Sequence, residues 1–159
     1  MEPTMGLGYA ALGAGIALGL AGAGTAIGLG FSGVAGTGII SEDPRKFGNV
    51  LVWNALPQTQ MIYGFLMAIL IMLGAGLLGG TPREISDTDG LIALGAGIVV
   101  GVTGLSGIGQ GSICGGGAIA SAKRPEVFGQ SLVLAVLAET PAIFGVVIAV
   151  LMLLSIGFL

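Results

Sequence analysis

Four long apolar stretches make up most of the chain, and three short polar links separate them. The stretches run roughly from Gly8 to Ile40, Phe47 to Leu78, Leu91 to Ala122 and Val127 to Phe158. Each has at least the ~20 residues that a bilayer-spanning helix needs. The links Ser41–Lys46, Gly79–Gly90 and Lys123–Glu126 all contain proline or glycine, as is typical of helix ends. The pattern predicts an all-α integral membrane protein with four transmembrane helices.

The second half of the chain repeats the first. Ala11–Ile16 recurs as Ala93–Ile98, at an offset of 82 residues. Further identities share an offset of 81: Pro44/Pro125, Phe47/Phe128, Gly48/Gly129, Leu51/Leu132, Val52/Val133, Leu56/Leu137, Thr59/Thr140, Ile62/Ile143, Gly64/Gly145 and Ala68/Ala149. The change of offset requires one inserted or deleted residue. We therefore expect two tandem fused hairpins, residues 1–80 and 81–159, with the spans at about 8–40 and 47–78, then 91–122 and 127–158.

Composition supports a membrane location and adds a packing feature. The chain is 54% hydrophobic and only 8% charged, against about 25% charged residues in soluble domains. Most of its 32 glycines lie in the first helix of each hairpin, where small residues let helices approach closely in lipid. Because they occupy nearly every helix face, they favour the inner wall of a ring of identical subunits over a monomeric bundle with one seam. We expect Cys114 to be a small buried residue, and methionine and aromatic side chains of the second helices to face lipid.

The charged residues predict an orientation. Alternating spans place the first and third links on one side, which carries Arg45, Lys46, Lys123 and Arg124. The other side carries Arg83 beside Glu84, Asp87 and Asp89. The positive-inside rule then makes the turns at 41–46 and 123–126 cytoplasmic. The first residues lack a basic segment and a cleavage site, so we expect the first span to be retained rather than removed as a signal peptide.

One carboxylate, Glu139, lies inside the fourth apolar stretch, and no other charge follows it up to Leu159. A charged side chain at that depth costs about 2.5–3.5 kcal/mol on insertion scales. It is retained where something binds it, pairs with it or protonates it. Glu139 is therefore the first candidate for a functional residue.

Few other polar groups lie deep in the spans. Thr59, Gln60 and Tyr63 are neighbours on one helix surface, and Pro57 disrupts the turn before them. Disrupted turns leave backbone carbonyls available, one of them near Leu56, and Pro141 has the same effect beside Glu139. With Gln110 of the third span, these groups offer only oxygen ligands, which suit a small hard cation. A single carboxylate favours a monovalent ion, and the absence of His and Cys from the set disfavours a transition metal.

Each of these residues also has a structural interpretation. Glutamine and threonine often bridge helices within a membrane, and Ser106 and Thr140 are more easily explained in that way. Gln58 aligns with Glu139 across the repeat, so the first hairpin has no matching acid.

Three motifs together resemble a known family. They are L-P-x-T-Q-x-x-Y-G starting at Leu56, L-S-G-I-x-Q-G starting at Leu105 and A-E-T starting at Ala138. With the fused hairpins, they resemble the ring-forming proteolipid (the K or c subunit) of V-type and archaeal A-type rotary ATPases, of the sodium-binding type. The resemblance implies a rotor ring in which every copy of the chain binds one Na⁺. Its ligands would be the Leu56 carbonyl, Thr59, Gln60, Gln110 and Glu139, with Tyr63 donating a hydrogen bond to the carboxylate. H⁺ is the alternative ion, and no organic cofactor is expected.

The same resemblance implies a set of partners. These are identical subunits in the ring, a stator subunit that supplies an arginine, a central-stalk subunit at the cytoplasmic turns and the lipid bilayer. A prokaryotic plasma membrane is the expected location. All ATP chemistry would lie in partner subunits, so we expect a non-catalytic subunit. The sequence lacks G-x-x-x-x-G-K-[ST], and we expect neither direct nucleotide binding nor a nucleic-acid partner. Since no span contains Arg or Lys, the countercharge for an empty Glu139 must come from another chain.

Two other functions fit the sequence less well. A small proton-coupled secondary transporter would use Glu139 with an aromatic-lined cavity, for which only Trp53 and Tyr63 are available. A structural or pore-forming protein would leave the cost of a buried Glu139 unexplained.

Overall fold

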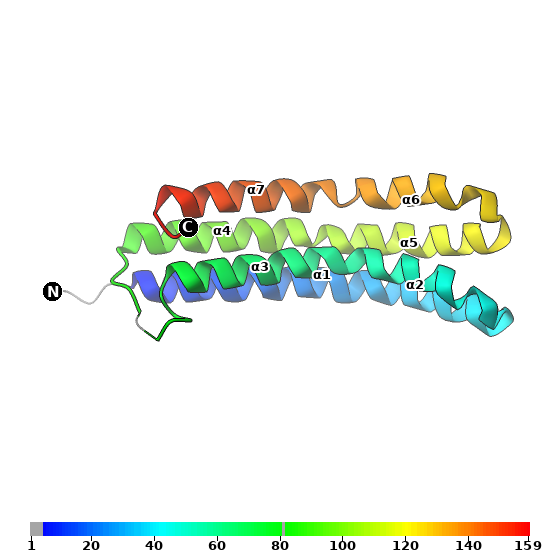
Figure 1. Ribbon diagram of the computed structural model, residues 1–159, viewed down its shortest axis with the longest axis horizontal. Helices are drawn as coiled ribbons and strands as arrows, with labels where there is room; N and C mark the ends of the chain where they lie inside the picture. Colours follow the sequence, from blue (N-terminus) through cyan, green and yellow to red (C-terminus); the bar gives the residue numbers. More distant parts are fainter. Residues whose placement is uncertain (1–4, 81) are drawn as a thin grey trace.

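The computed structural model describes residues 5–80 and 82–159, which form one elongated bundle of helices (Figure 1). The first span is a single helix, α1 (Gly6–Glu42). The second consists of a 3₁₀ turn (Pro44–Lys46), α2 (Phe47–Ala55), a 3₁₀ turn (Leu56–Gln58) and α3 (Thr59–Gly74). The third contains α4 (Asp87–Gly104) and α5 (Ser106–Lys123), and the fourth a 3₁₀ turn (Pro125–Val127), α6 (Phe128–Leu137) and α7 (Thr140–Ser155).

The prediction of four spans is confirmed within the described residues: the helical segments Gly6–Glu42, Pro44–Gly74, Asp87–Lys123 and Pro125–Ser155 are long and apolar enough to cross a membrane. The second and fourth spans end earlier than expected. Gly76 and Gly157 adopt φ of 72° and 68°, and the Leu77 and Phe158 N–H groups bond back to Met72 and Leu153. A glycine in this left-handed conformation ends a helix, because the N–H of the following residue bonds back to a carbonyl of the last turn. The expected boundary between hairpins, at 80/81, stays a prediction, and Thr81 lies outside the described residues.

Glycine determines how closely the central helices pack. Helix α1 lies along α4 and α5, with α3 on its outer side, while α6 and α7 cover α5 and α4 (Figure 1). A Cβ on Gly97 would collide with the Gly13 backbone, and one on Gly111 with that of Gly28. The helix axes can come this close only because both faces lack side chains.

The surface of the bundle is apolar. Val34 is 77% exposed, Phe144 66% and Leu134 60%, as expected for side chains that face lipid or other subunits. Phe144 is exposed, as the expectation that aromatic and methionine side chains of the outer helices face lipid requires. The expectation is wrong for Met67 and Trp53, which are buried.

Trp53 is buried because its indole N–H finds partners inside the bundle. It donates to Asn49 Oδ1 at 2.9 Å and to Ser121 Oγ at 3.1 Å. The ring also packs edge-on against Phe128, with 5.2 Å between the ring centroids. Because the indole N–H is hydrogen-bonded, burial of its polar atom carries no desolvation penalty. These contacts link α2 to α5 and α6.

The break in the third span was not predicted. At Leu105 the N–H bonds to Val102 O at 3.1 Å in a tight 3₁₀ turn, where α1 continues as a regular helix. The internal repeat changes its offset at the same place. Gly22 matches Gly104 at the offset of 82, whereas Thr25 matches Ser106 at 81, so the third span lacks one residue at this point. The deletion and the break coincide.

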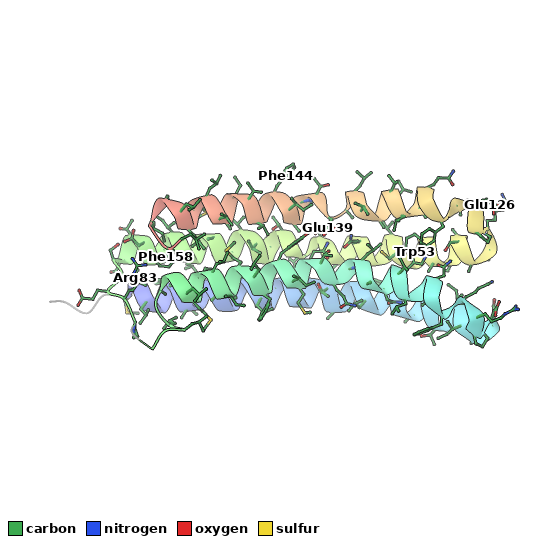
Figure 2. All side chains as sticks on the ribbon, viewed as in Figure 1. Trp53, Arg83, Glu126, Glu139, Phe144 and Phe158 are labelled. Carbon is green, nitrogen blue, oxygen red and sulfur yellow. The ribbon has the colours of Figure 1, made fainter. Side chains whose placement is uncertain are left out.

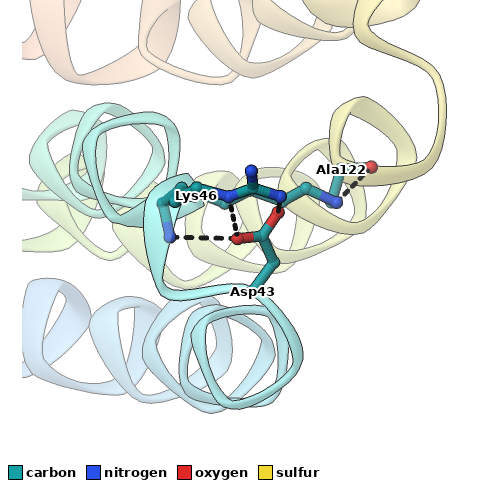
Figure 3. A network of polar contacts seen from close by, with 4 residues as sticks. Asp43, Lys46 and Ala122 are labelled. Carbon is teal, nitrogen blue, oxygen red and sulfur yellow. Dashed lines mark hydrogen bonds and ion pairs between the residues drawn. The ribbon is translucent and has the colours of Figure 1, made fainter.

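Polar contacts tie the hairpins together at both ends. Lys46 Nζ donates to Ala122 O at 2.9 Å and thereby caps the C-terminus of α5 (Figure 3). In the same turn, a side-chain hydrogen bond from Arg45 holds the pKa of Asp43 below its ordinary value. At the opposite end, Arg83 Nη1 donates to Gly74 O at 2.9 Å and Gly157 O at 3.3 Å, close to Phe158 (Figure 2).

Because α1 and α5 lie so close together, a methyl group added at their contact should destabilise the protein, whereas one added at an open position should not. Gly111→Ala should lower the midpoint of thermal unfolding in detergent, because overpacking typically costs about 1–3 kcal/mol. Gly48→Ala is the matched control, since a Cβ there meets nothing within 4 Å. Equal midpoints for the two variants would contradict the packing described for α1 and α5.

Candidate ion-binding site

Glu139 lies midway along the bundle, at the break between α6 and α7 (Figure 2). Its N–H bonds to Val136 O at 3.0 Å instead of continuing the α-helical pattern to Ala135 O. Pro141, two residues on, has no N–H to donate. The side chain is partly buried, and Tyr63 OH donates to Glu139 Oε1 at 2.7 Å. This is the hydrogen bond that the resemblance implies, and it joins α3 of the first hairpin to the second hairpin.

A second group of oxygens gathers where the 3₁₀ turn at Pro57 meets α3. Thr59 Oγ1 donates to Leu56 O at 3.0 Å and lies 3.3 Å from Gln60 Oε1. Leu56 O points to this hydroxyl because the tight turn before α3 brings the two residues together. The Thr59 hydroxyl and these two oxygens thus form a group of three.

The two glutamines extend this group across the hairpins. Gln60 and Gln110 are both 0% exposed, and Gln60 Nε2 donates to Gln110 Oε1 at 2.7 Å. Gln110 Nε2 in turn donates to Ala135 O at 3.1 Å. A buried amide is costly unless it is hydrogen-bonded, so these contacts stabilise both side chains and fix their direction.

The predicted ligands therefore form two neighbouring groups. Leu56, Thr59, Gln60 and Gln110 share one hydrogen-bond network. Tyr63, one turn along α3 from Gln60, holds the Glu139 carboxylate. In the part of the chain that the structure describes, no hydrogen bond runs from the Glu139 carboxylate to the network itself.

Gln58, the repeat equivalent of Glu139, takes no part in either group. Its side chain is exposed and donates to Asn54 O at 3.3 Å, away from the network. The first hairpin therefore contributes oxygens to the site of the second hairpin but builds no equivalent site of its own.

The Ala135 carbonyl was missed in the sequence. Proline at 141 identifies Leu137, four residues earlier, as the carbonyl that loses its donor. In the structure the Glu139 N–H bonds to Val136 O instead of Ala135 O. The Ala135 carbonyl accepts the hydrogen bond from Gln110 Nε2. No sequence signal distinguishes the two carbonyls.

This arrangement has the chemistry of a small-cation site. Carboxylate, hydroxyl, amide and backbone oxygens come from the middle of three spans. Among the described residues, no three His, Cys, Asp or Glu side chains gather in one place, so the site has low charge. A single carboxylate with neutral oxygens compensates one positive charge.

Comparison with known proteins links these features to a family. The profile of the family described as the C subunit of ATP synthase matches residues 12–71 and 94–152. The A-type ATP synthase subunit K of Methanocaldococcus jannaschii is 43% identical over 146 residues, which are 92% of this chain and 62% of that protein. The V-type sodium ATPase subunit K of Enterococcus hirae is 38% identical over 125 residues, 78% of this chain and 76% of that protein. The chain thus spans less than two thirds of the Methanocaldococcus relative. These relatives are named as ATPase or ATP synthase subunits, in agreement with the expectation of a non-catalytic subunit.

The buried glutamine pair predicts a stability effect that does not depend on any ion. Gln110→Leu leaves the Gln60 amide and Ala135 O without partners, and each unsatisfied buried group costs about 1–3 kcal/mol. The thermal midpoint in detergent without Na⁺ should therefore fall clearly below that of Gln58→Leu, which alters an exposed amide. A Gln110→Leu variant as stable as the Gln58→Leu control would show that the network contributes nothing to folding.

Proposed function

Because the chain belongs to the family of ATP synthase C subunits, we propose that it is the ion-carrying subunit of a membrane rotor ring in a V/A-type ATPase. The observation that carries the proposal is the mid-span Glu139, bonded to Tyr63 one turn from two fully buried glutamines. Such a carboxylate is the group to which an ion or proton binds during transfer across a membrane. ATP chemistry then belongs to partner subunits.

We further propose Na⁺ as the carried ion. Leu56 O and Gln60 Oε1 lie 3.0 and 3.3 Å from Thr59 Oγ1, so the three oxygens are close enough to coordinate one cation once the Thr59 O–H turns away from it. A proton carrier needs only Glu139, so it would leave the buried glutamines without a transport role. The relative from Enterococcus hirae, which is named a sodium ATPase subunit, supports the same choice. H⁺ remains the alternative ion.

The ion and the carboxylate would neutralise each other. Bound Na⁺ removes the net charge of Glu139, and the occupied site can then face lipid at low cost. An empty site needs a positive partner, and all five Lys and Arg residues lie outside the apolar interiors of the spans. A stator subunit that supplies an arginine meets this need. The basic turns at 41–46 and 123–126 would face the cytoplasm of a prokaryotic cell and contact a central-stalk subunit.

The secondary-transporter alternative is weakened by the position of Trp53. Such a transporter would use this ring to line a substrate cavity. The side chain is instead 0% exposed and engaged by Asn49, Ser121 and Phe128. Only Tyr63 is left as an aromatic group beside the carboxylate.

Replacement of the carboxylate tests the rotor role. Glu139→Gln keeps the side-chain volume but removes the negative charge that balances the carried ion, so ATP-driven ion uptake should fall to background in vesicles that contain the assembled complex. Native mass spectrometry of the same preparation should show an unchanged ring. Glu84→Gln, which alters an exposed carboxylate in the link between hairpins, should transport normally. Persistent uptake by Glu139→Gln would refute the proposed mechanism.

A further inference from the structure

Two hydroxyl groups in the middle of the bundle have no hydrogen-bond partner in the part of the chain that the structure describes. They belong to Thr25 of α1 and Ser106 of α5, and both oxygens are enclosed by protein. Thr25 is only 2% exposed. A buried hydroxyl without a partner is costly, and native proteins pair nearly all such groups with protein atoms or with ordered water. These two hydroxyls therefore point to a ligand.

Other hydroxyls of the spans bond to the helix that carries them. Thr37 Oγ1 donates to Gly33 O at 2.9 Å, and Thr103 Oγ1 donates to Val99 O at 2.8 Å. Serine and threonine side chains within a helix commonly bond to a carbonyl one turn earlier. Thr25 makes no such bond. Its hydroxyl is therefore available to a group outside its own helix.

The two hydroxyls meet at the break in the third span. Thr25 and Ser106 are equivalent in the internal repeat, at the offset of 81. An added Cβ on Gly107 would lie 3.2 Å from Thr25 N, so the start of α5 packs on the backbone of α1 at this point. Ser106 is the first residue of α5 and precedes Gly107. The hydroxyls thus come from two segments that are in backbone contact.

The break also leaves a backbone carbonyl beside α1. Ile108 N–H bonds to Leu105 O at 3.0 Å instead of continuing the α-helical pattern to Gly104 O. Gly104 O would lie 2.8 Å from a Cβ on Gly24, the residue before Thr25. Among the described residues, no direct hydrogen bond joins this carbonyl to either hydroxyl. Polar groups that face each other across such a gap are commonly bridged by water.

A bound water agrees with the break itself. Helices are interrupted at proline, at Gly/Ser pairs or where water inserts into the ladder of backbone hydrogen bonds. The residues from 101 to 111 contain no proline, whereas Ser106 and Gly107 form a Gly/Ser pair. A water bonded to the Ser106 hydroxyl would take the place of the regular donor to Gly104 O.

We propose that internal water is bound at the break in the third span, held by the hydroxyls of Thr25 and Ser106 and by the carbonyl of Gly104. Three hydrogen bonds are typical of a buried water. Water can accept from the hydroxyls while it donates to the carbonyl, so it satisfies all three groups. A cation fits less well, because the three groups are neutral and include no carboxylate to balance its charge.

The bound water also positions a residue of the ion site. Gln110 follows Ser106 by four residues, so the two side chains lie on the same side of α5. The Gln110 amide contacts Gln60 and Ala135 O. The water fixes the geometry of the break, and the break sets the direction of the first turns of α5 and with it the position of Gln110. This positioning role rests on the proposed transport of Na⁺, whereas the water site itself does not.

A structure of the purified ring, at a resolution that shows ordered water, tests the site. Density should lie within hydrogen-bonding distance of Thr25 Oγ1 and Gly104 O. It should be absent from Thr25→Val, which keeps the shape of the side chain but removes the hydroxyl. Thr103→Val removes a hydroxyl that already bonds to Val99 O, so it should keep the density. Maps that resolve other internal waters but none at this position would overturn the proposal.

Thermal unfolding of the same variants gives a second, independent result. A hydroxyl without any partner is a cost, so Thr25→Val would raise the unfolding midpoint if no water were bound. With water bound, the variant loses hydrogen bonds, and its midpoint should fall below those of the wild type and of Thr103→Val. A higher midpoint for Thr25→Val than for the wild type would contradict the water site.

Sodium binding tests the positioning role. The Na⁺ concentration that protects Glu139 from carbodiimide labelling should rise several-fold in Thr25→Val and in Ser106→Ala, and it should stay unchanged in Thr103→Val. Unchanged protection in variants that have lost the density would refute the positioning role and leave the water site standing. If Na⁺ gave no protection in the wild-type ring either, the proposed transport of Na⁺ would be wrong, and the density would still decide the water site.

Discussion

A carboxylate in the middle of a membrane-spanning segment must be neutralised, since its charge costs about 2.5–3.5 kcal/mol even on insertion scales. Most features near the centre of this bundle can be understood as responses to that cost. Tyr63 donates to Glu139, and the fully buried Gln60 and Gln110 bring amide groups to the same depth. These polar groups are tolerated because they are hydrogen-bonded to one another and to backbone carbonyls. The cation that completes the charge balance is the proposed cargo.

The site depends on how closely the helices pack and on where they break. Glycine contacts such as Gly28 on Gly111 bring α1 and α5 together, which lets Gln110 on α5 reach the outer spans. At the breaks near Pro57 and before Pro141, the Leu56 and Ala135 carbonyls accept side-chain hydrogen bonds from Thr59 and Gln110. Irregular backbone inside a membrane is tolerated where it is buried in protein. Packing by small residues and interruption by proline thus act together, one positioning side chains and the other supplying oxygens.

The spans and the repeat could be predicted from the sequence because both depend on local composition: ~20 apolar residues form a spanning helix whatever surrounds them. The Gln60–Gln110 contact could only be guessed, because two residues 50 positions apart in the chain meet through tertiary packing. Trp53 was misjudged for the same reason, since its burial depends on Ser121 of another span. The break at Leu105 coincides with the change of the repeat offset by one residue, and the residues around it contain no proline that would have predicted it.

The most direct measurement is carbodiimide labelling of Glu139 in the purified ring, followed across pH with and without NaCl. The reagent attacks the protonated carboxyl, so Na⁺ bound at Glu139 should displace the proton and slow labelling, while K⁺ should not. Thr59→Val, which removes the hydroxyl between Leu56 O and Gln60 Oε1, should raise the Na⁺ concentration needed for protection. Labelling that follows pH alone, unaffected by Na⁺ in both proteins, would contradict the sodium site and leave a proton-carrying carboxylate.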